Sequence, residues 1–162
     1  MRALDRQFSQ ARAGHGGFTM TELMIVLVVM GILAALAAPS FSDMIKSQRI
    51  KSMASDLNAS LTLARSEAIK RNRLVTMAPI TAGAWQGGWR IADPDNAGSY
   101  IEEHEAVASL TSTGPDSVVY RTSGRIQGTV APQFNISAAG TSTVRCVTVD
   151  LSGRPYIKDS AC

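Results

Sequence analysis

The most apolar stretch of the chain lies near its N-terminus. From Leu23 to Ala38 no side chain is charged or strongly polar. A helix over residues 18–38 would be about 32 Å long at ~1.5 Å per residue, which matches the ~30 Å hydrocarbon core of a membrane. The pattern therefore predicts a transmembrane helix over residues 18–39.

A second hydrophobic pattern follows this segment. Apolar residues recur at spacings of three and four, as an amphipathic helix requires. They are Ile50, Met53, Leu57, Leu61, Ala64 and Ala68. We expect this helix, over residues 40–73, to continue the first one, with Pro39 producing a kink rather than a break. Cations near residue 73 favour a helix C-terminus there, and Asn72 can end the helix.

Short segments separated by turn residues fill the rest of the chain, residues 74–162. They favour strands, over residues 74–80, 88–92, 100–108, 117–122, 124–130, 132–137 and 143–150. A long helix followed by short strands, with no second helical period, predicts an α+β fold. In this fold an antiparallel β-sheet head packs on the amphipathic half of the long N-terminal helix. The expected core includes four aromatic residues, Trp85, Trp89, Tyr120 and Phe134.

Charge is unevenly distributed along the chain, whose formal net charge is +3. Residues 1–17 form a basic leader with a charge of +2, whereas the predicted head carries −2. Basic flanks of a membrane helix stay in the cytoplasm, so we expect the head to cross the membrane. Because the head is mildly acidic, a nucleic-acid site in it would need local clustering of cations.

Cys146 and Cys162 are the two cysteines of the chain. An even pair behind an export-like N-terminus predicts a disulfide formed in an oxidising compartment. Closing that loop would stabilise the fold by ~3 kcal/mol. Two buried free thiols are the alternative interpretation.

A cleaved secretory signal peptide is the alternative to a retained transmembrane helix. Residues 35–37, Ala-Leu-Ala, form an acceptable small-x-small cleavage site after an apolar run of ordinary length. Cleavage there would release a soluble secreted protein. The amphipathic pattern that continues beyond this site favours the retained helix.

Enzyme and metal chemistry find little support in the sequence. Residues 93–98, Asp-Pro-Asp-Asn-Ala-Gly, lack the ligands that an EF-hand needs at positions 97 and 104, so we expect a turn. His104 is the one histidine after Gly17, and neither a phosphate-binding glycine loop nor a spaced Cys/His set is present in the sequence. We therefore expect no enzyme activity, no cofactor and no metal site.

Residues 17–23, Gly-Phe-Thr-Met-Thr-Glu-Leu, followed by the apolar stretch with Pro39, resemble the class III signal of type IV pilins and type II secretion pseudopilins. The resemblance implies that a prepilin peptidase cuts after Gly17 and that Phe18 becomes the N-methylated first residue. It also implies that Glu22 is required for assembly. The protein would then cross the inner membrane once, with a cytoplasmic N-terminus and a periplasmic head, before it enters a pilus or pseudopilus.

An ion pair between subunits would explain why Glu22 places a carboxylate in an apolar membrane helix. A charge at membrane depth costs ~2.5 to 3.5 kcal/mol and persists when it has a partner. The free amine of a neighbouring subunit's Phe18 would be such a partner, and the ion pair would set the axial register of stacked helices. The alternative is that Glu22 only favours the helix dipole, which is worth ~0.3 to 1 kcal/mol.

Residues 64–68, Ala-Arg-Ser-Glu-Ala, resemble a run that GspH/FimT minor pilins carry just before their first strand. This implies a structural subunit that primes or caps assembly, at the tip of a type IV pilus or a type II secretion pseudopilus. The implied partners are other minor pilins, the major pilin or pseudopilin, and inner-membrane lipid before assembly. The sequence does not separate the two machines, because both use the same architecture.

The C-terminal residues suggest DNA uptake as an alternative function. Some FimT-like minor pilins bind DNA through a Gly-Arg-x-Arg motif, and Gly153-Arg154 supplies its first half, with Tyr156 replacing the second arginine. The candidate phosphate-binding cations are Arg154, Lys158, Arg145 and Arg125. The competing interpretation is that Gly153 forms a hairpin turn and Arg154 is merely solvated.

Overall fold

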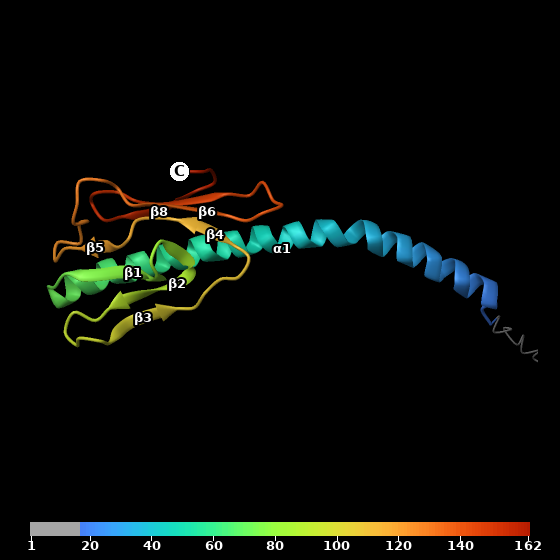
Figure 1. The fold of residues 1–162 in the computed structure, drawn as a ribbon, viewed down its shortest axis with the longest axis horizontal. Coiled ribbons are helices and arrows are strands. Elements are labelled where there is room, and N and C mark those ends of the chain that lie inside the picture. The colour runs from blue at the N-terminus through green and yellow to red at the C-terminus, as the bar shows by residue number, and fades with distance from the viewer. Residues whose placement is uncertain (1–16) are drawn as a thin grey trace, which may run out of the picture. The chain divides into compact units, whose positions relative to one another are not determined.

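A computed structural model describes residues 17–162, apart from the side chains of residues 37–40; residues 1–16 of the predicted leader lie outside the described part. Figure 1 shows one long helix followed by a β-rich head. By its internal contacts the chain divides into two compact units, residues 1–39 and residues 40–162. The observed α+β architecture confirms the predicted fold class.

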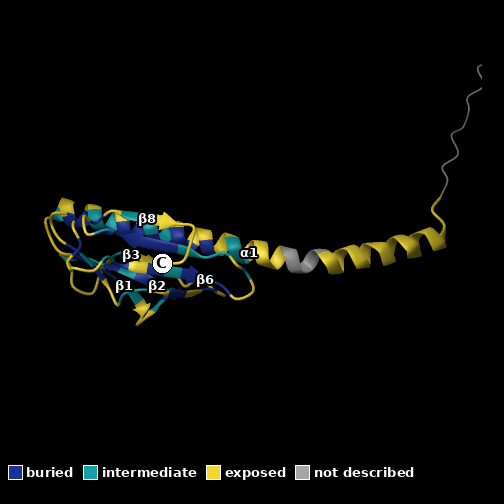
Figure 2. Cartoon of the chain, turned by 90° about the horizontal axis from the view of Figure 1, so that it is seen from above, coloured by how far each residue is buried: buried dark blue, intermediate teal, exposed yellow. Residues whose placement is uncertain are grey.

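Helix α1 extends from Met20 to Arg71 and continues through Pro39 without ending. Its first half is apolar on all sides and exposed, and it is long and apolar enough to cross a membrane. Its second half buries one face, which contains the predicted residues Ile50, Met53, Leu57, Leu61, Ala64 and Ala68. Figure 2 shows this change from an exposed to a partly buried helix.

The end of α1 is fixed by Asn72, as its sequence position predicts. Asn72 adopts a left-handed backbone conformation with φ of 51°. Its N–H donates to the carbonyl of Ile69, and the N–H of Arg73 donates to the carbonyl of Ala68. These two hydrogen bonds form a Schellman motif, which satisfies carbonyls that the helix end leaves free.

The head contains two antiparallel sheets instead of the single sheet that the strand pattern suggested. Sheet A has the strand order β3-β2-β1-β5, and sheet B has the order β4-β6-β7-β8. The strands are β1 (Val75–Thr81), β2 (Ala84–Ala92), β3 (Tyr100–His104), β4 (Thr111–Thr113), β5 (Val118–Tyr120), β6 (Gln133–Ser137), β7 (Arg145–Val149) and β8 (Pro155–Lys158). Gln86 of β2 links the sheets by accepting hydrogen bonds from the backbone N–H and the hydroxyl of Ser112 in β4.

One predicted strand is absent from the structure, and two strands of the structure were not predicted. The segment 124–130 forms one isolated bridge, between Tyr120 and Ile126, rather than a strand. Its backbone leaves the extended region at Gly124 and Gly128, which both have positive φ. Strands β4 and β8 escaped prediction because they lie at sheet edges and are only three and four residues long, which is too short for a hydrophobic period to show in the sequence.

One hydrophobic core joins the second half of α1 to both sheets. The four predicted aromatic residues Trp85, Trp89, Tyr120 and Phe134 are fully buried in it. Trp85 packs edge-on against Phe134, with ring centroids 4.7 Å apart. The indole N–H of Trp89 donates to the hydroxyl of Ser60, which in turn donates to Glu102 Oε1, so the helix and sheet A are also joined by hydrogen bonds.

A network of charged side chains ties the end of α1 to the turn between β2 and β3. Arg71 contacts Glu67 (2.6 Å), Asp93 (2.8 Å) and Asp95 (3.0 Å). The hydrogen bond from Arg71 holds the pKa of Glu67 below its usual range. Hydrogen bonds from the backbone of Asp95 and the side chain of Asn96 lower the pKa of Asp93. Residues 93–98 therefore form the predicted turn, and their carboxylates bind a guanidinium group.

The disulfide between Cys146 and Cys162 is present and joins the C-terminal residues to β7. The bridged cysteines are separated by 16 positions. Loss of chain entropy in the unfolded state gives a bridge of this span a stabilising effect of ~3 kcal/mol. The bridge anchors the last residues of the chain against sheet B.

We predict that the Arg71 network makes the head sensitive to acid. Because the native pKa values of Glu67 and Asp93 lie below those of the unfolded chain, their stabilisation is complete above about pH 5 and is lost as the pH falls through the native values. The thermal midpoint of the detergent-solubilised chain, measured by circular dichroism, should therefore fall below about pH 5. Glu67→Gln should lower the midpoint at neutral pH and flatten its pH dependence.

Glu105→Gln is the matched control for this measurement. Glu105 is exposed and makes no ion pair with any residue in the described range, so its substitution should leave the pH profile unchanged. A Glu67→Gln profile parallel to that of the unsubstituted chain would contradict the role given to the network.

Candidate functional sites

Glu22 and Thr19 form a reciprocal capping box at the start of α1. Thr19 donates to Glu22 Oε2 through its backbone N–H (3.1 Å) and its hydroxyl (3.0 Å). The N–H of Glu22 donates to the hydroxyl oxygen of Thr19 at 3.2 Å. This arrangement satisfies donors that the first turn of a helix otherwise leaves free. The spacing Thr-x-x-Glu is visible in the sequence, so Thr19 is a site residue that the sequence signals but that our sequence analysis missed.

The capping box uses only one oxygen of the Glu22 carboxylate. Within residues 17–162, no hydrogen-bond partner is found for Oε1. The local role of Glu22 at the helix N-terminus is thus established by geometry. The second oxygen is available to an incoming cation, which is the role that the sequence predicts for Glu22 in assembly.

The predicted processing site lies just outside the helix. Gly17, Phe18 and Thr19 precede α1 and have no regular secondary structure. The side chain of Phe18 is 84% exposed, and no atom of residues 17–162 would lie within 4 Å of a Cβ atom built on Gly17. A peptide bond between Gly17 and Phe18 is therefore sterically open to an enzyme.

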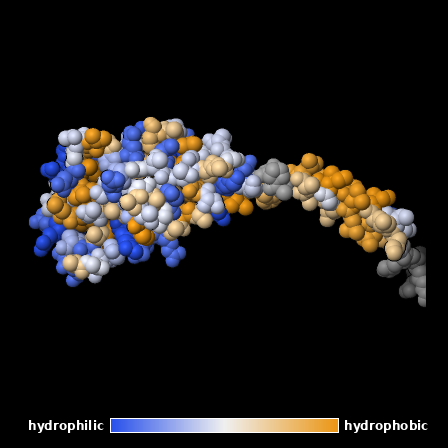
Figure 3. Space-filling model, viewed as in Figure 1, coloured by the Kyte–Doolittle hydropathy of each residue, from blue (hydrophilic) through white to orange (hydrophobic). Residues whose placement is uncertain are grey.

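The apolar surface of α1 has no partner within the described part of the chain. The large apolar side chains from Leu23 to Leu36 are all about half exposed or more. The exposure continues into the second unit at Phe41, Met44 and Ile45. Figure 3 shows this hydrophobic surface on the first half of the helix. Such an area requires lipid or other apolar helices around it.

The second candidate site, at the C-terminal hairpin, is built on two glycine turns. The turn between β7 and β8 closes with a hydrogen bond from the N–H of Gly153 to the carbonyl of Asp150. Gly153 has φ of 87°, and a Cβ atom on it would collide with the carbonyl of Gly124 in the turn after β5. The predicted hairpin role of Gly153 is confirmed, and this contact places the turns that carry Arg154 and Arg125 next to each other.

The four predicted DNA-binding cations do not gather at one place. Arg154 and Arg125 lie on the two touching turns and are exposed. Lys158 pairs with Cys146 in the strand register, three residues along β8 from Pro155, which is roughly 10 Å at ~3.3 Å per residue. Arg145 lies at that same end of the hairpin and is only 18% exposed, because it pairs with Asp159 at 3.1 Å.

The structure adds two arginines, Arg121 and Arg65, that the sequence analysis did not select for this site. Arg121 and Arg125 line a hollow of about 220 Å³ together with Leu151. A Cβ atom on Gly124 would lie 3.2 Å from Arg65 Nε of α1. Arg65 is far from this turn in sequence and approaches Gly124 only in the folded head, so no local sequence signal could have joined it to Arg121 and Arg125.

Tyr120 and Asp150 lie beneath these arginines. Burial raises the pKa of Tyr120, whose hydroxyl is buried without a hydrogen-bond partner among the described residues. The hydroxyl of Ser152 and the backbone N–H of Arg154 lower the pKa of Asp150 by donating hydrogen bonds to its carboxylate. Asp150 is thus ionised near neutral pH and is used within its own turn.

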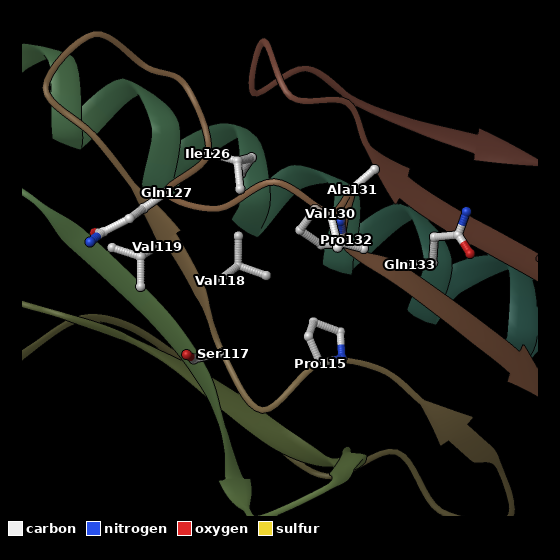
Figure 4. Close-up of a pocket in the computed structure, with 10 residues that line it drawn as sticks. All are labelled: Pro115, Ser117, Val118, Val119, Ile126, Gln127, Val130, Ala131, Pro132 and Gln133. Atoms are coloured by element: carbon white, nitrogen blue, oxygen red, sulfur yellow. The ribbon is translucent and has the colours of Figure 1, made fainter.

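A hollow of about 410 Å³ lies between β5 and the start of β6. Figure 4 shows Val118, Ile126 and Val130 among the residues that line it. No charged side chain lines it, and the described residues contain no cluster of metal-ligating side chains. Aliphatic side chains, two prolines, Ser117, Gln127 and Gln133 line this hollow.

Comparison with known protein families gives two matches. Residues 53–153 match the family described as type II transport protein GspH. Residues 12–38 match the prokaryotic N-terminal methylation motif. The first match covers most of the head and the second covers the predicted processing site and the first half of α1.

The chain also resembles individual proteins. It is 37% identical over 62 residues to a fimbrial protein of Pseudomonas aeruginosa, covering 38% of this chain and 40% of that protein. It is 37% identical over 81 residues to the pilin-like protein PilA1 of Thermus thermophilus, covering 50% of this chain and 49% of the relative. The chain thus spans half or less of the length of these relatives.

Two solved structures share the fold. The type IV minor pilin FimU of Pseudomonas aeruginosa superposes with a TM-score of 0.63 at 22% identity, covering 71% of this chain and 93% of that chain. The minor pseudopilin EpsH from the type 2 secretion system of Vibrio cholerae gives a TM-score of 0.54 at 12% identity, covering 68% and 97%. At these identities the likeness concerns the fold.

We predict that the hydroxyl of Thr19 stabilises the first turn of α1. Thr19→Val removes the hydroxyl and should destabilise the helix start by ~1 kcal/mol. Amide hydrogen exchange of the first-turn residues, measured in detergent micelles, should then be about fivefold faster. Thr19→Ser keeps the hydroxyl and should exchange like the unsubstituted chain. Equal exchange in the Val and Ser variants would show that the capping box contributes nothing.

Proposed function

The chain belongs to the GspH family, and we propose that it primes or caps the assembly of a filament of pilin-like subunits. It is a minor pilin or pseudopilin, a structural subunit of a type IV pilus or a type II secretion pseudopilus. The observation that carries the proposal is the apolar first half of α1, whose large side chains are about half exposed or more and whose first turn holds Glu22, with one carboxylate oxygen free among the described residues. The similarity of the head to a minor pilin and to a minor pseudopilin supports the minor role.

The proposed course of events begins in the inner membrane. The first half of α1 spans the bilayer once, with the basic leader in the cytoplasm and the head in the periplasm. A prepilin peptidase cuts after the exposed Gly17, and the new N-terminal residue, Phe18, is N-methylated. Lipid covers the apolar surface until other pilin-like subunits replace it.

Assembly then depends on an ion pair between subunits. The free oxygen of Glu22 accepts the Phe18 ammonium group of a neighbour, while Thr19 holds the other oxygen. A carboxylate left unpaired at this depth costs ~2.5 to 3.5 kcal/mol. Apolar helices slide past one another at little cost, so this penalty selects the axial register at which each carboxylate meets an amine.

DNA binding by a tip subunit stays an alternative prediction. The contact between the turns of Arg125 and Arg154 favours it, because two predicted phosphate-binding cations become neighbours. The remaining two cations lie at the other end of the hairpin, and Arg145 already has a carboxylate partner. Filament assembly is therefore the function that the geometry supports best.

We predict that Glu22→Gln separates capping from ion pairing. Glutamine can complete the capping box as glutamate does, but it carries no charge. The variant should be processed and stay in the membrane. Its content in sheared filaments, measured by immunoblot, should nevertheless fall on the order of 100-fold, because the Phe18 ammonium group of the neighbouring subunit is then left without a partner at membrane depth. Glu22→Ala should show the same defect.

Asp43→Asn is the matched control, because Asp43 is an exposed carboxylate of α1 that pairs only with Lys46 among the described residues. It should assemble normally. If Glu22→Gln also assembles normally while Glu22→Ala does not, the carboxylate acts only in the local cap, and the intersubunit ion pair is wrong.

A further inference from the structure

The end of the head at which α1 terminates carries a surface that the assembly helix does not use. We call it the apical patch, and it consists of Arg65, Ile69, Arg121, Arg125, Leu151 and Arg154. These residues come from α1, from the turn after β5 and from the turn between β7 and β8. Figure 3 shows hydrophilic and hydrophobic residues mixed at this end of the head.

The patch is continuous because its three segments touch. A Cβ atom on Gly124 would overlap Ile69 Cδ1 and come within 3.2 Å of Arg65 Nε. A Cβ atom on Gly153 would collide with the carbonyl of Gly124. The hollow beside this contact is lined by Arg121, Arg125 and Leu151. Glycine is thus required at both turns for the segments to approach so closely.

The arginines of the patch have no carboxylate partner. In the described chain, none of Arg65, Arg121, Arg125 and Arg154 forms an ion pair within 4.0 Å, whereas Arg71 and Arg145 do. Arg65 Nε is also buried and lacks a hydrogen-bond acceptor. The nearby Asp150 is held by Ser152 and by the backbone of Arg154. The patch therefore presents several arginines that form no ion pair among the described residues, and the single carboxylate of Asp150, which interacts electrostatically with Arg65, offsets only part of their positive charge.

Apolar side chains lie between these charges. Ile69 is 52% exposed and Leu151 is 40% exposed. Leu74, which is 53% exposed, borders the patch, because Val75 pairs with Tyr120 and thus places Leu74 beside Arg121. A surface of arginine and aliphatic side chains without lysine is typical of protein interfaces, where a planar guanidinium can pair with a carboxylate at low desolvation cost.

We propose that the apical patch docks a carboxylate-bearing, partly aliphatic surface on a neighbouring pilin-like subunit. The partner's aspartate or glutamate side chains pair with Arg121, Arg125 and Arg154, and its apolar side chains cover Ile69 and Leu151. This inference rests on the proposed assembly function, since the partner is a filament neighbour. A phosphate backbone fits less well, because it offers nothing to the aliphatic side chains of Ile69 and Leu151.

Zero-length carbodiimide coupling tests this proposal directly. Single variants Arg121→Lys and Arg125→Lys of the full chain keep the positive charge but add an amine that couples to a contacting carboxylate. They are expressed in cells that assemble the filament, which is sheared, treated with carbodiimide and digested for mass spectrometry. We expect an isopeptide link from position 121 or 125 to an aspartate or glutamate of another pilin-like subunit.

Two controls accompany the coupling experiment. The unsubstituted chain, which has arginine at both positions, should give no such link. Arg73→Lys should couple within the chain to Asp95, since Arg73 lies 3.7 Å from that carboxylate, and this link shows that the reaction works. Formation of the Cys146–Cys162 disulfide verifies that each variant folds.

The outcomes separate the patch from the assembly function. Filaments that contain both variants but yield no intersubunit link would overturn the patch proposal and leave assembly intact. Absence of the unsubstituted chain from filaments would overturn both. A third outcome concerns duplex DNA. The detergent-solubilised full chain could bind DNA in a salt-sensitive manner and lose this binding when Arg121 and Arg125 are both changed to Ala. That result would assign the patch to nucleic acid and overturn the proposal.

Discussion

The exposed apolar surface on the first half of α1 is the constraint on which the rest of the structure depends. Nothing in the described chain covers the side chains from Leu23 to Leu36, so the protein needs lipid or other apolar helices around it. The free energy of this apolar contact is nearly the same for every rotation and axial position of the helix. The carboxylate of Glu22 supplies the specificity that apolar contact lacks, because its free oxygen has one favourable partner position.

The interactions that stabilise the head do not depend on whether lipid or other apolar helices surround the first half of α1. The second half of α1 buries Leu57 and Leu61 in a core shared by both sheets. Asn72 stops the helix, and the Arg71 network fixes its end to the turn before β3. The disulfide holds the C-terminal residues on sheet B. These interactions all lie within residues 40–162 and are independent of what surrounds the first half of the helix.

Hydrophobic periodicity predicted the long helix well, because a uniform apolar run and a spacing of three and four distinguish its two halves. It failed for β4 and β8, whose few residues lie at sheet edges, and it could not show that the strands divide into two sheets. Sheet membership depends on strand pairings such as that of β1 with β5, whose residues lie far apart in sequence.

The two candidate sites likewise differ in whether they depend on a local sequence pattern or on contacts between distant segments. Gly17, Phe18 and Glu22 could be predicted because their chemistry is local and their spacing is fixed along one segment. Arg125 and Arg154 were candidates from the sequence, but the proximity of their turns to each other and to Arg65 could not be predicted, since these segments approach only in the folded head, at Gly124 and Gly153. Local spacing also suggested that Lys158 and Arg154 act together, but an antiparallel hairpin separates residues along its length.

The central claim is that the first half of α1 stays on the mature protein as an assembly helix. The intact mass of the protein extracted from membranes, with its N-terminal peptide sequenced by mass spectrometry, tests this claim most directly. Our account predicts a chain that begins at Phe18, carries one methyl group on that residue and retains the whole helix. A mature chain that begins at Ala38 would contradict it, because Glu22 and the apolar surface would then have been removed with a signal peptide.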